Sequence, residues 1–337
     1  MKAVVLTSYT KPVVVGEFPE PVLGPRDVLV GVQAAGLNQL DEKLRAGEFR
    51  QLVPLALPAV LGHDVAGTVL EVGSEVRTSQ PGDSVYGRVR DGRIGTFAER
   101  IAADESDLAP VPAALTMAEA ASLPLVALTA WQALVVRADV RPGQKVLIHA
   151  GAGGVGSIAI QLAKHLGATV ATTAGAANAE FVASLGADVV IDYRSDDFEQ
   201  QLAGYDVVLD SVGGENLMKS LRILGPGGRA IGIAGPPDPA FARQLRLNPV
   251  LRVGIAAISR NVRRAARTAG VDYSFLWMSA SGDQLRQISA LVESGAIRPI
   301  VGRVVSFDEI PEALAGLGTS GVRGKVVASI PFAATRR

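Results

Sequence analysis

The chain contains no cysteine, few aromatic residues and no excess of charge of either sign. Without a thiol it can form no disulfide bond and can offer no thiolate to a metal ion. Its 33 basic and 33 acidic residues cancel, so no overall field would draw it to nucleic acid or to an acidic membrane surface. No apolar run approaches the roughly 18 residues that a membrane-crossing helix needs, and the N-terminus has no signal-cleavage pattern. We therefore expect a cytoplasmic protein that binds neither membranes nor nucleic acid.

Glycine and aliphatic residues, by contrast, are plentiful. The 337 residues include 37 glycines, and 48% of the chain is hydrophobic, which is ordinary for a tightly packed α/β protein. A chain of this length is expected to form two domains.

The strongest functional signal is a glycine-rich loop that follows an apolar strand and opens a helix with one apolar face. The loop places Gly151, Gly153 and Gly156 in the spacing G-x-G-x-x-G directly after the apolar run at 146–148. In a dinucleotide-binding βαβ unit the first glycine makes the tight turn, the second lets the backbone approach a pyrophosphate, and the third brings helix and strand together. The phosphates would lie at the positive N-terminal end of the helix. A turn that needs glycine only for its geometry is the alternative.

The cofactor is expected to be NADP(H) rather than NAD(H). An NAD-specific site places a carboxylate on the ribose 2′-hydroxyl about 20 residues after the loop. Here the second strand, 168–173, leads into the uncharged stretch 174–178, and the next acid, Glu180, lies inside the following helix. The first Arg or Lys after this strand is Arg194. The candidate partners of a 2′-phosphate are Thr172, Thr173, Asn178, Tyr193 and Arg194.

Strands and helices continue to alternate through this half of the chain. Residues 189–191, 206–210 and 229–234 are typical of buried strands separated by helical segments, which predicts a doubly wound parallel sheet. Ligands bind such sheets at the carboxyl ends of the strands. The loops 210–214 and 232–235 should therefore face the cofactor, although each residue in them is as readily explained by a simple turn.

The part of the chain before residue 124 has a different pattern. It is rich in valine, glycine and proline, with short alternating runs such as 28–33 and 67–72 and turns between them. This pattern predicts a small β-barrel-like domain.

Five short motifs are spread over nearly the whole chain: Gly62-His63-Asp64-Val65-Ala66-Gly67-Thr68-Val69, Pro81-Gly82-Asp83-Ser84-Val85, the glycines at 151–156, Asp210-Ser211-Val212-Gly213 and Gly324-Lys325-Val326-Val327. Their order and spacing resemble those of the medium-chain dehydrogenase/reductase superfamily. The resemblance implies an α/β fold, with a doubly wound Rossmann domain and a GroES-like β-barrel catalytic domain. The expected division is 1–123 catalytic, 124–296 NADP-binding and 297–337 catalytic again, with a helix at 283–294 and returning strands at 299–305 and 324–330.

The superfamily contains zinc-dependent alcohol dehydrogenases and zinc-free reductases. In the zinc enzymes a catalytic zinc takes thiolate and imidazole ligands, and a lobe with four cysteines holds a second metal. Neither site can form here, because Asn38 stands at the position of the first thiolate and the segment after Val85 has no cysteine. His63 has lost its co-ligands, so we expect a hydrogen-bonded structural residue, with a substrate contact as the alternative. No metal site is predicted.

Without zinc no Lewis acid polarises the substrate, so the hydride acceptor must already be electron-poor. Quinones and α,β-unsaturated carbonyl compounds meet this condition, because the added hydride gives a delocalised anion. The resemblance is closest to the quinone oxidoreductase-like group and its alkenal and enone reductase relatives. That group usually reads Asn-Pro-x-Asp-x-Lys where this chain reads Asn38-Gln39-Leu40-Asp41-Glu42-Lys43, without the proline.

Three side chains are expected to act on the substrate. Asn38 would donate to the substrate oxygen, and Lys43 would stabilise the developing anion if it reaches inward. Tyr86 is a candidate proton donor, although a packed aromatic is the favoured interpretation. For Lys43 and Asp41 a solvated helix face is equally open. The residues expected to contact NADP(H) are Thr129, Gly151, Gly153, Gly154, Val155, Gly156, Thr173, Asn178, Tyr193, Ser211, Val212, Gly232, Ile233, Phe275, Leu276 and Lys325, of which the resemblance places Thr129 by the nicotinamide ribose.

Between residues 239 and 271 the sequence has seven arginines and no acidic residue. Interleaved apolar residues predict a basic amphipathic helical insertion before a strand at 273–278. A subunit contact or a lid over the cofactor phosphates is preferred over a membrane-surface helix, and we expect a homodimer. Two functions without turnover stay open: an NADP-binding regulatory or crystallin-like protein, and an RNA-binding protein that uses these arginines.

Overall fold

The computed structural model describes residues 1–318 and 321–331. They form two compact units: unit 1 comprises Met1–Leu128 and the residues from Ser279 onward, and unit 2 comprises Thr129–Met278. The sequence places the boundaries at 123/124 and 296/297. In the structure the first boundary lies inside helix α3 (Pro124–Trp131), and the second precedes helix α11 (Gly282–Glu293).

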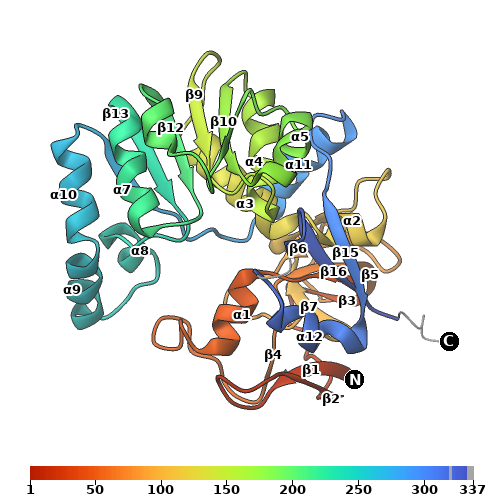
Figure 1. The fold of residues 1–337 in the computed structure, drawn as a ribbon. Coiled ribbons are helices and arrows are strands. Elements are labelled where there is room, and N and C mark those ends of the chain that lie inside the picture. Colours follow the sequence, from red (N-terminus) through yellow and green to blue (C-terminus); the bar gives the residue numbers. More distant parts are fainter. Residues whose placement is uncertain (319–320, 332–337) are drawn as a thin grey trace. The chain divides into compact units, whose positions relative to one another are not determined.

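Unit 2 is built on a six-stranded parallel sheet (Figure 1). The strand order is β11-β10-β9-β12-β13-β14, and every pairing is parallel. The chain runs outward from β9 to β11 and then returns to the other side of β9, so the order reverses between β9 and β12. This doubly wound sheet confirms the predicted fold class and puts its ligand crevice at the carboxyl ends of those strands. The strands are β9 (Lys145–Ile148), β10 (Thr169–Ala174), β11 (Val189–Asp192), β12 (Tyr205–Asp210), β13 (Leu224–Gly232) and β14 (Asp272–Phe275).

The sheet of unit 2 is covered on both faces. Consecutive residues of a strand point to opposite faces, yet Val146, Leu147 and Ile148 are all fully buried. The apolar run that opens the glycine motif is therefore the central strand of a two-sided core. The connecting helices are α4 (Gly154–His165), α5 (Ala179–Ser184), α6 (Phe198–Gln201) and α7 (Gly214–Ile223), with a 3₁₀ turn at Ala176–Asn178 and a π-helix at Gln132–Arg137 after α3.

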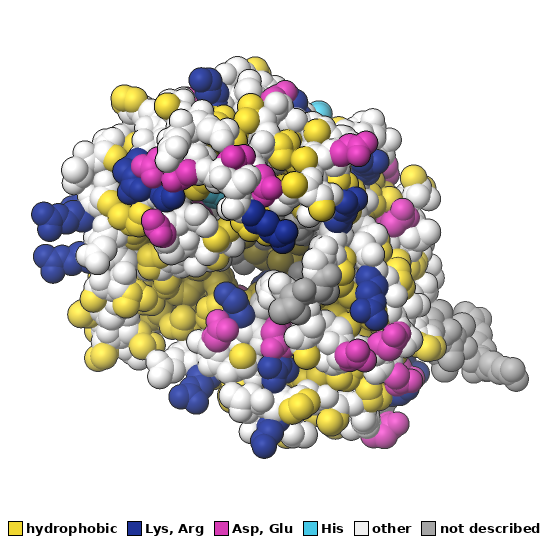
Figure 2. All heavy atoms as spheres, viewed as in Figure 1, with side chains coloured by type: hydrophobic (Ala, Val, Ile, Leu, Met, Phe, Trp, Pro, Cys, Tyr) yellow, Lys and Arg dark blue, Asp and Glu magenta, His cyan; other side chains and the backbone are white. Residues whose placement is uncertain are grey.

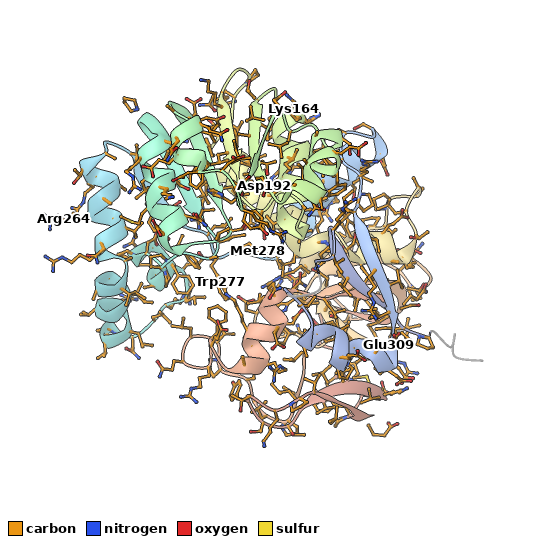
Figure 3. The ribbon with its side chains drawn as sticks, in the orientation of Figure 1. Lys164, Asp192, Arg264, Trp277, Met278 and Glu309 are labelled. Carbon is orange, nitrogen blue, oxygen red and sulfur yellow. The ribbon has the colours of Figure 1, made fainter. Side chains whose placement is uncertain are left out.

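The basic insertion is helical, as expected, and forms three helices: α8 (Pro239–Gln244), α9 (Pro249–Ile258) and α10 (Arg260–Thr268). Asp238 and Asn248 cap α8 and α9 by accepting from Phe241 and Leu251 N–H, and each helix then begins with proline, which needs no N–H partner there. Val250 and Val253 of α9 are exposed, and Arg264 of α10 points outward (Figure 3). The strand after the insertion is β14, which is shorter than the expected 273–278.

Basic and acidic side chains are interspersed on the face shown in Figure 2, in keeping with the balanced composition. Within residues 1–318 and 321–331, no helix combines the length and the apolar character required to cross a membrane.

Unit 1 holds the β-rich part of the chain. One sheet has the order β15-β16-β3-β5-β6-β8, with β7 pairing β3, and a three-stranded sheet has the order β2-β1-β4. Strand β16 pairs with β3, so the end of the chain returns to the strands of the first domain. The strands are β1 (Lys2–Leu6), β2 (Val14–Glu17), β3 (Asp27–Gly36), β4 (Ala59–Val60), β5 (Asp64–Val72), β6 (Ser84–Arg88), β7 (Arg100–Asp104), β8 (Leu108–Pro110), β15 (Val301–Ser306) and β16 (Lys325–Ser329).

Helix α11 belongs to unit 1 and not, as the sequence suggests, to the nucleotide-binding unit. The Tyr86 hydroxyl donates to the Leu285 carbonyl at 3.1 Å, and a Cβ on Gly282 would lie 2.1 Å from the Leu108 carbonyl oxygen. The helix thus rests directly on the backbone of β8, a contact that glycine permits and that periodicity cannot reveal. Among the described residues, unit 1 also contains the α-helices α1 (Gln39–Ala46), α2 (Met117–Ala121) and α12 (Ile310–Ala315), as well as the first part of α3.

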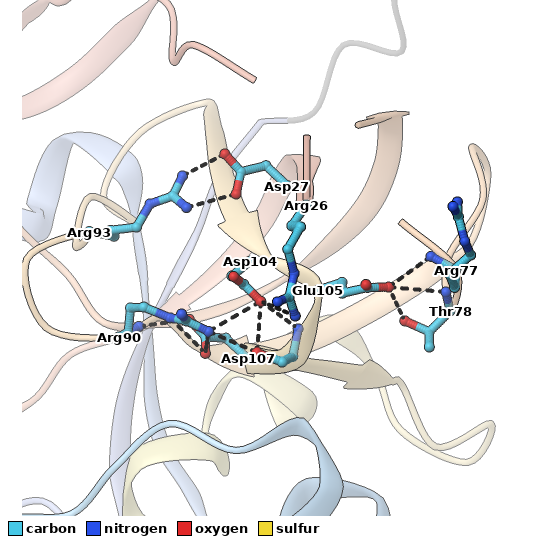
Figure 4. Close-up of polar contacts among 10 residues, drawn as sticks. Arg26, Asp27, Arg77, Thr78, Arg90, Arg93, Asp104, Glu105 and Asp107 are labelled. Carbon is cyan, nitrogen blue, oxygen red and sulfur yellow. Dashed lines mark hydrogen bonds and ion pairs between the residues drawn. The ribbon is translucent and has the colours of Figure 1, made fainter. Parts of the chain in front are cut away.

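A network of ion pairs ties the start of β3 to the loop after β6 (Figure 4). Arg93 donates to both carboxylate oxygens of Asp27 at 2.7 Å, and Arg90 donates to Asp107 at 2.7 Å. The hydrogen bonds from Arg93 hold the pKa of Asp27 below its ordinary value, although burial opposes them. Because the folded pKa is depressed, this stabilisation is present above the pKa of the unfolded chain and disappears as the pH falls through the folded pKa.

We expect Asp27→Asn to lower the free energy of unfolding at pH 7 by about 1–2 kcal/mol, since charge-assisted hydrogen bonds are lost. The difference from wild type should begin to shrink below about pH 4, where Asp27 of the unfolded chain takes up a proton, and it should disappear only below the depressed pKa of the folded state. Urea unfolding at pH 7 and pH 3.5 measures this, with the exposed Asp308→Asn as a control. A difference that is the same at both pH values would contradict the assignment.

Candidate active site

The glycine loop of unit 2 has the close contacts that the motif predicts. A Cβ on Gly151 would lie 2.1 Å from Thr172 Oγ1, and a Cβ on Gly156 would lie 2.3 Å from the Ala150 carbonyl oxygen. Ala150 itself has a φ of 53°, the left-handed conformation that starts the turn. Neither glycine position has room for a side chain, so the loop and the first turn of α4 can pack this tightly only with glycine.

The first turn of α4 is suited to hold phosphate. Helix α4 begins at Gly154, and its N-cap Gly153 supplies no side-chain cap to the first amides. Gly154 and Val155, both expected cofactor contacts, therefore lie in a helix turn whose N–H groups are available to an anion and whose dipole favours one. A Cβ on Gly153 would meet only the Ala150 carbonyl oxygen at 3.3 Å, so this position is less crowded than its neighbours. The residues present thus fit a dinucleotide pyrophosphate.

A buried histidine that the sequence analysis did not consider, His149, supports the glycine loop through hydrogen bonds. His149 Nε2 lies 2.9 Å from Ser220 Oγ, and its Nδ1 lies 3.1 Å from Thr173 Oγ1. Ser220 already donates to the Asn216 carbonyl, so it accepts from Nε2–H, and His149 is the neutral Nε2–H tautomer. Burial lowers its pKa, which is consistent with a neutral ring.

Thr173 is part of this support. Its hydroxyl accepts from the Ala150 N–H at 3.1 Å and faces His149 Nδ1, and the side chain is buried. The structure therefore places Thr173, expected to contact the cofactor, beneath the glycine loop, with its hydroxyl engaged by the loop.

Hydrogen bonds connect the carboxyl ends of β12, β13 and β14 to one another. Asp210 Oδ1 accepts from the N–H groups of Val212 and Gly213 at 2.8 and 2.6 Å, which folds that loop back on its strand. The Ile233 N–H donates to the Asp210 carbonyl at 2.8 Å. Two further bonds extend the set: Ser211 Oγ donates to the His149 carbonyl at 3.1 Å, and the Leu276 N–H donates to the Gly232 carbonyl at 2.8 Å. The structure thus brings together the expected contacts Ser211, Val212, Gly232, Ile233 and Leu276, with Phe275 buried at the end of β14.

A charged corner forms where β10 and β11 end. The Arg194 guanidinium lies 5.6 Å from the Tyr193 ring centre, and a Cβ on Gly175 would lie 3.8 Å from both side chains. Sheet pairing places Asp192 of β11 opposite Ala174 of β10 (Figure 3). The end of β10 has no carboxylate of its own, but Asp192 supplies one to this corner from the next strand. Its oxygens accept from the backbone N–H groups of Ala176 and Arg194. Asn178 lies in the adjoining 3₁₀ turn.

In unit 1 a buried polar network surrounds Asn38. Its Nδ2 donates to Asp64 Oδ2 at 3.0 Å and to the Gly36 carbonyl at 3.2 Å, and its Oδ1 accepts from Lys325 Nζ. Lys325 also donates to the Leu37 carbonyl at 2.7 Å. Lys325, expected at the cofactor, thus has its ammonium committed to the network around Asn38.

His63 is a hydrogen-bonded structural residue in this structure. It is buried, and its Nδ1 lies 2.5 Å from Asp41 Oδ1. Asp41 Oδ2 accepts from the Asn38 N–H at 2.9 Å, so this pair fixes the start of α1. Over the described residues, no three His, Asp or Glu side chains are grouped as metal ligands, and the sequence has no cysteine. These donors do not make a zinc site.

The other expected substrate contacts differ in accessibility. Lys43, in the last turn of α1, is partly exposed and lies 3.9 Å from Glu48, so a solvated helix face describes its present position. Tyr86 is fully buried, and its hydroxyl contacts Ser289 Oγ at 2.8 Å as well as the Leu285 carbonyl. Burial raises the pKa of Tyr86 to about 12. The structure thus places Tyr86 as the packed aromatic that the sequence analysis favoured. Thr129 is buried within α3.

Comparison with known proteins identifies the family. The model of the alcohol dehydrogenase GroES-like domain matches residues 24–113, and that of the zinc-binding dehydrogenase matches 185–327. The chain is 34% identical over 331 residues to the mitochondrial NAD(P)H oxidoreductase RTN4IP1 of Danio rerio, covering 91% of this chain and 84% of that protein. The chain belongs to the medium-chain dehydrogenase/reductase superfamily. Within it, the quinone oxidoreductase of Coxiella burnetii has a similar structure, with a TM-score of 0.86 and 31% identity over 98% of this chain and 99% of that one.

An enone reductase is also among the relatives. The 2-methylene-furan-3-one reductase of Solanum lycopersicum is 36% identical over 318 residues, which cover 91% of this chain and 72% of that protein. The chain therefore falls in the quinone oxidoreductase-like group, and it is an oxidoreductase with a nicotinamide cofactor. One matching model is named for zinc, but the donor residues described above do not fit that metal.

We expect Gly156→Ala to raise the dissociation constant of NADPH at least tenfold. The new methyl group would lie 2.3 Å from the Ala150 carbonyl oxygen, so the loop must shift away from the first turn of α4. Fluorescence titration measures the effect. Gly254→Ala, a helical position with no atom within 4 Å of the added Cβ, is the matched control. Equal NADPH affinity in both variants would show that the loop does not hold the cofactor.

Proposed function

We propose that the protein is an NADPH-dependent, zinc-independent reductase that transfers hydride to quinones or α,β-unsaturated carbonyl compounds. The observation that carries this proposal is a glycine loop with the close contacts of a dinucleotide cradle, in a chain that has no cysteine and whose described residues (1–318 and 321–331) group no metal ligands. The names of the relatives support it: one is an NAD(P)H oxidoreductase, one an enone reductase and one a quinone oxidoreductase.

The kind of acceptor follows from the lack of metal ligands among the described residues. When bound, the reduced nicotinamide supplies the hydride, and the chain supplies binding, orientation and electrostatics. Hydride addition leaves negative charge on the acceptor oxygen, and no Lewis acid is available from these residues to bear it. Acceptors that delocalise this charge themselves are therefore favoured over simple carbonyls. A proton from solvent then completes the two-electron reduction.

We assign the hydrogen bond to the acceptor oxygen to Asn38. Of its two Nδ2 hydrogen bonds, the one to the Gly36 carbonyl is the longer, at 3.2 Å, and is the one that substrate would replace. Lys43 would approach the developing anion by leaving Glu48, which lies 3.9 Å away. Tyr86 is not assigned proton donation, because its hydroxyl is buried and already bonded to the Leu285 carbonyl.

We assign the preference for NADPH to the corner formed by Tyr193, Arg194 and the adjoining Thr173–Asn178 segment. Arg194 is the cation that a 2′-phosphate would meet there. Asp192 would oppose an anion, but both its oxygens accept backbone N–H bonds, which orients them toward the loop. The homodimer, the cytoplasmic location and the absence of a membrane or nucleic-acid partner stay expectations.

Arg194→Ala should weaken NADPH binding about tenfold and leave NADH binding nearly unchanged, because a charge-assisted bond to phosphate is worth about 1.5–3 kcal/mol. Gly175→Asp should shift preference further toward NADH by repelling the 2′-phosphate. Parallel titrations with both cofactors measure these effects, and Arg222→Ala, an exposed arginine paired with Glu199, serves as the control. Wild-type protein that binds NADH as tightly as NADPH would contradict the assignment.

Asn38→Ala should lower kcat/KM for the acceptor roughly tenfold or more, since a hydrogen bond to developing charge contributes about 1.5–3 kcal/mol. NADPH affinity should barely change, because Asn38 belongs to unit 1 and its side-chain hydrogen bonds are made within that unit, whereas the glycine loop belongs to unit 2. Stopped-flow NADPH oxidation with a quinone and an enone measures this, and Asn261→Ala on α10 is the control. An unchanged rate would remove Asn38 from the site.

The same assay decides between turnover and the alternatives without it. The proposed enzyme oxidises NADPH with quinones or conjugated enones and does not reduce NADP⁺ with simple alcohols. Cofactor binding without turnover of any acceptor would favour the alternative of an NADP-binding regulatory or crystallin-like protein.

A further inference from the structure

A buried pair of opposite charges in unit 1 has no role in the proposed chemistry so far. Asp64 begins β5 and Lys325 begins β16, far apart in the sequence, and both side chains are at least nine-tenths buried. Lys325 Nζ lies 3.3 Å from Asp64 Oδ2. Burying two charges costs several kcal/mol each, and apolar residues of similar size often stabilise a core as well or better. Stability alone therefore does not account for a charged pair at this position.

The pair sets which way the Asn38 amide faces. Lys325 donates to Asn38 Oδ1, and Asp64 Oδ2 accepts from Asn38 Nδ2 at 3.0 Å. Flipping the amide would turn its NH₂ group toward an ammonium, which has no lone pair to offer, and its carbonyl toward a carboxylate, which has no proton. Cation and carboxylate thus oppose the flip from two sides, and Nδ2 is kept as the donor atom.

Asp64 also anchors helix α3. Its Oδ1 accepts from the Leu125 N–H at 2.8 Å, in the first turn of the helix that carries Thr129 one turn later. Gly36 leaves the space for this carboxylate, because a Cβ there would lie 2.9 Å from Asp64 Oδ2 and 2.5 Å from the Ala121 carbonyl oxygen. One carboxylate is therefore bonded both to the residue assigned to the acceptor and to the helix of a residue expected at the cofactor.

We propose that Asp64 and Lys325 are positioning residues that lock the Asn38 amide as a hydrogen-bond donor and hold α3 in register with it. The inference rests on the proposed function, in which Asn38 bonds the acceptor oxygen. Neither charge touches the acceptor: Asp64 acts through Asn38 and the backbone of Leu125, and Lys325 acts through Asn38 and Asp64.

The electrostatics of the pair give the proposal a distinctive signature. Burial raises the pKa of Asp64 and lowers that of Lys325, and each opposes the shift of the other. Asp41, which is hydrogen-bonded to His63, is the other charged neighbour, and it raises the pKa of Asp64 further. Removing Lys325 therefore raises the pKa of Asp64 again, so the carboxylate that accepts from Asn38 is protonated at low pH and restored as the pH rises.

The test compares Lys325→Met, Asp64→Asn and the double variant with wild type, using NADPH and a quinone. Each single variant should lose at least tenfold in kcat/KM for the quinone, with an NADPH dissociation constant within twofold of wild type. The loss in Lys325→Met, relative to wild type at the same pH, should shrink as the pH rises and Asp64 regains its charge. The double variant should lose less than the product of the single losses, because it strands no buried charge. Lys2→Met, which breaks an exposed pair with Asp308 in the same unit, is the control.

The outcomes separate the inference from the function on which it rests. If wild type reduces the quinone and the folded single variants match it within twofold, with parallel pH profiles, the positioning role is wrong. If wild type reduces no quinone or enone, the proposed function fails first. Thermal melting identifies variants that do not fold; should Lys325→Met be one of them, the isosteric Asp64→Asn carries the same prediction for kcat/KM.

Discussion

The hydrogen-bond network around Asn38, the residue assigned to the substrate, depends on the carboxylate of Asp64. This carboxylate accepts from the Asn38 amide, the Lys325 ammonium and the Leu125 N–H, and so joins α1, β16 and α3 through one buried group. A buried carboxylate is tolerated only when its oxygens are satisfied, which makes each of these partners necessary to the others. That mutual dependence sets the direction of a single N–H bond, and the proposed reaction uses that direction.

The cofactor-binding loop of unit 2 depends on a different constraint, the lack of space around Gly151 and Gly156. Gly151 and Gly156 stand against backbone and side-chain atoms at distances that no Cβ can accept, and His149 holds the loop from beneath as a neutral hydrogen-bond bridge. The parallel sheet gathers the remaining loops at its carboxyl edge, because all its strands run in the same direction and the chain leaves β9 and β12 toward opposite sides of the sheet. Tight backbone packing and strand order together form the cradle, and few of its contacts depend on a charged side chain.

The sequence was sufficient for features that depend on local pattern. The glycine spacing after an apolar strand predicted the βαβ unit, the alternating runs predicted the β-rich domain, and the lack of cysteine removed the thiolate ligands. It was insufficient where partners come from distant segments. The contact of Lys325 with Asn38 depends on the pairing of β16 with β3; Asp192 reaches the nucleotide corner only through the pairing of β11 with β10; and α11 joins unit 1 through Gly282. No periodicity within one segment encodes such pairings. The roles of Asn38, Lys43 and the nucleotide corner stay predictions.

The central claim is hydride transfer to an electron-poor acceptor without a metal. It is tested most directly by measuring the metal content of the purified protein, removing any metal with a chelator, and following NADPH oxidation with a quinone and a conjugated enone. The account predicts full activity after chelation, with no gain on adding zinc and no oxidation of simple alcohols with NADP⁺. Stoichiometric zinc whose removal abolishes activity, and whose return restores it, would contradict the account.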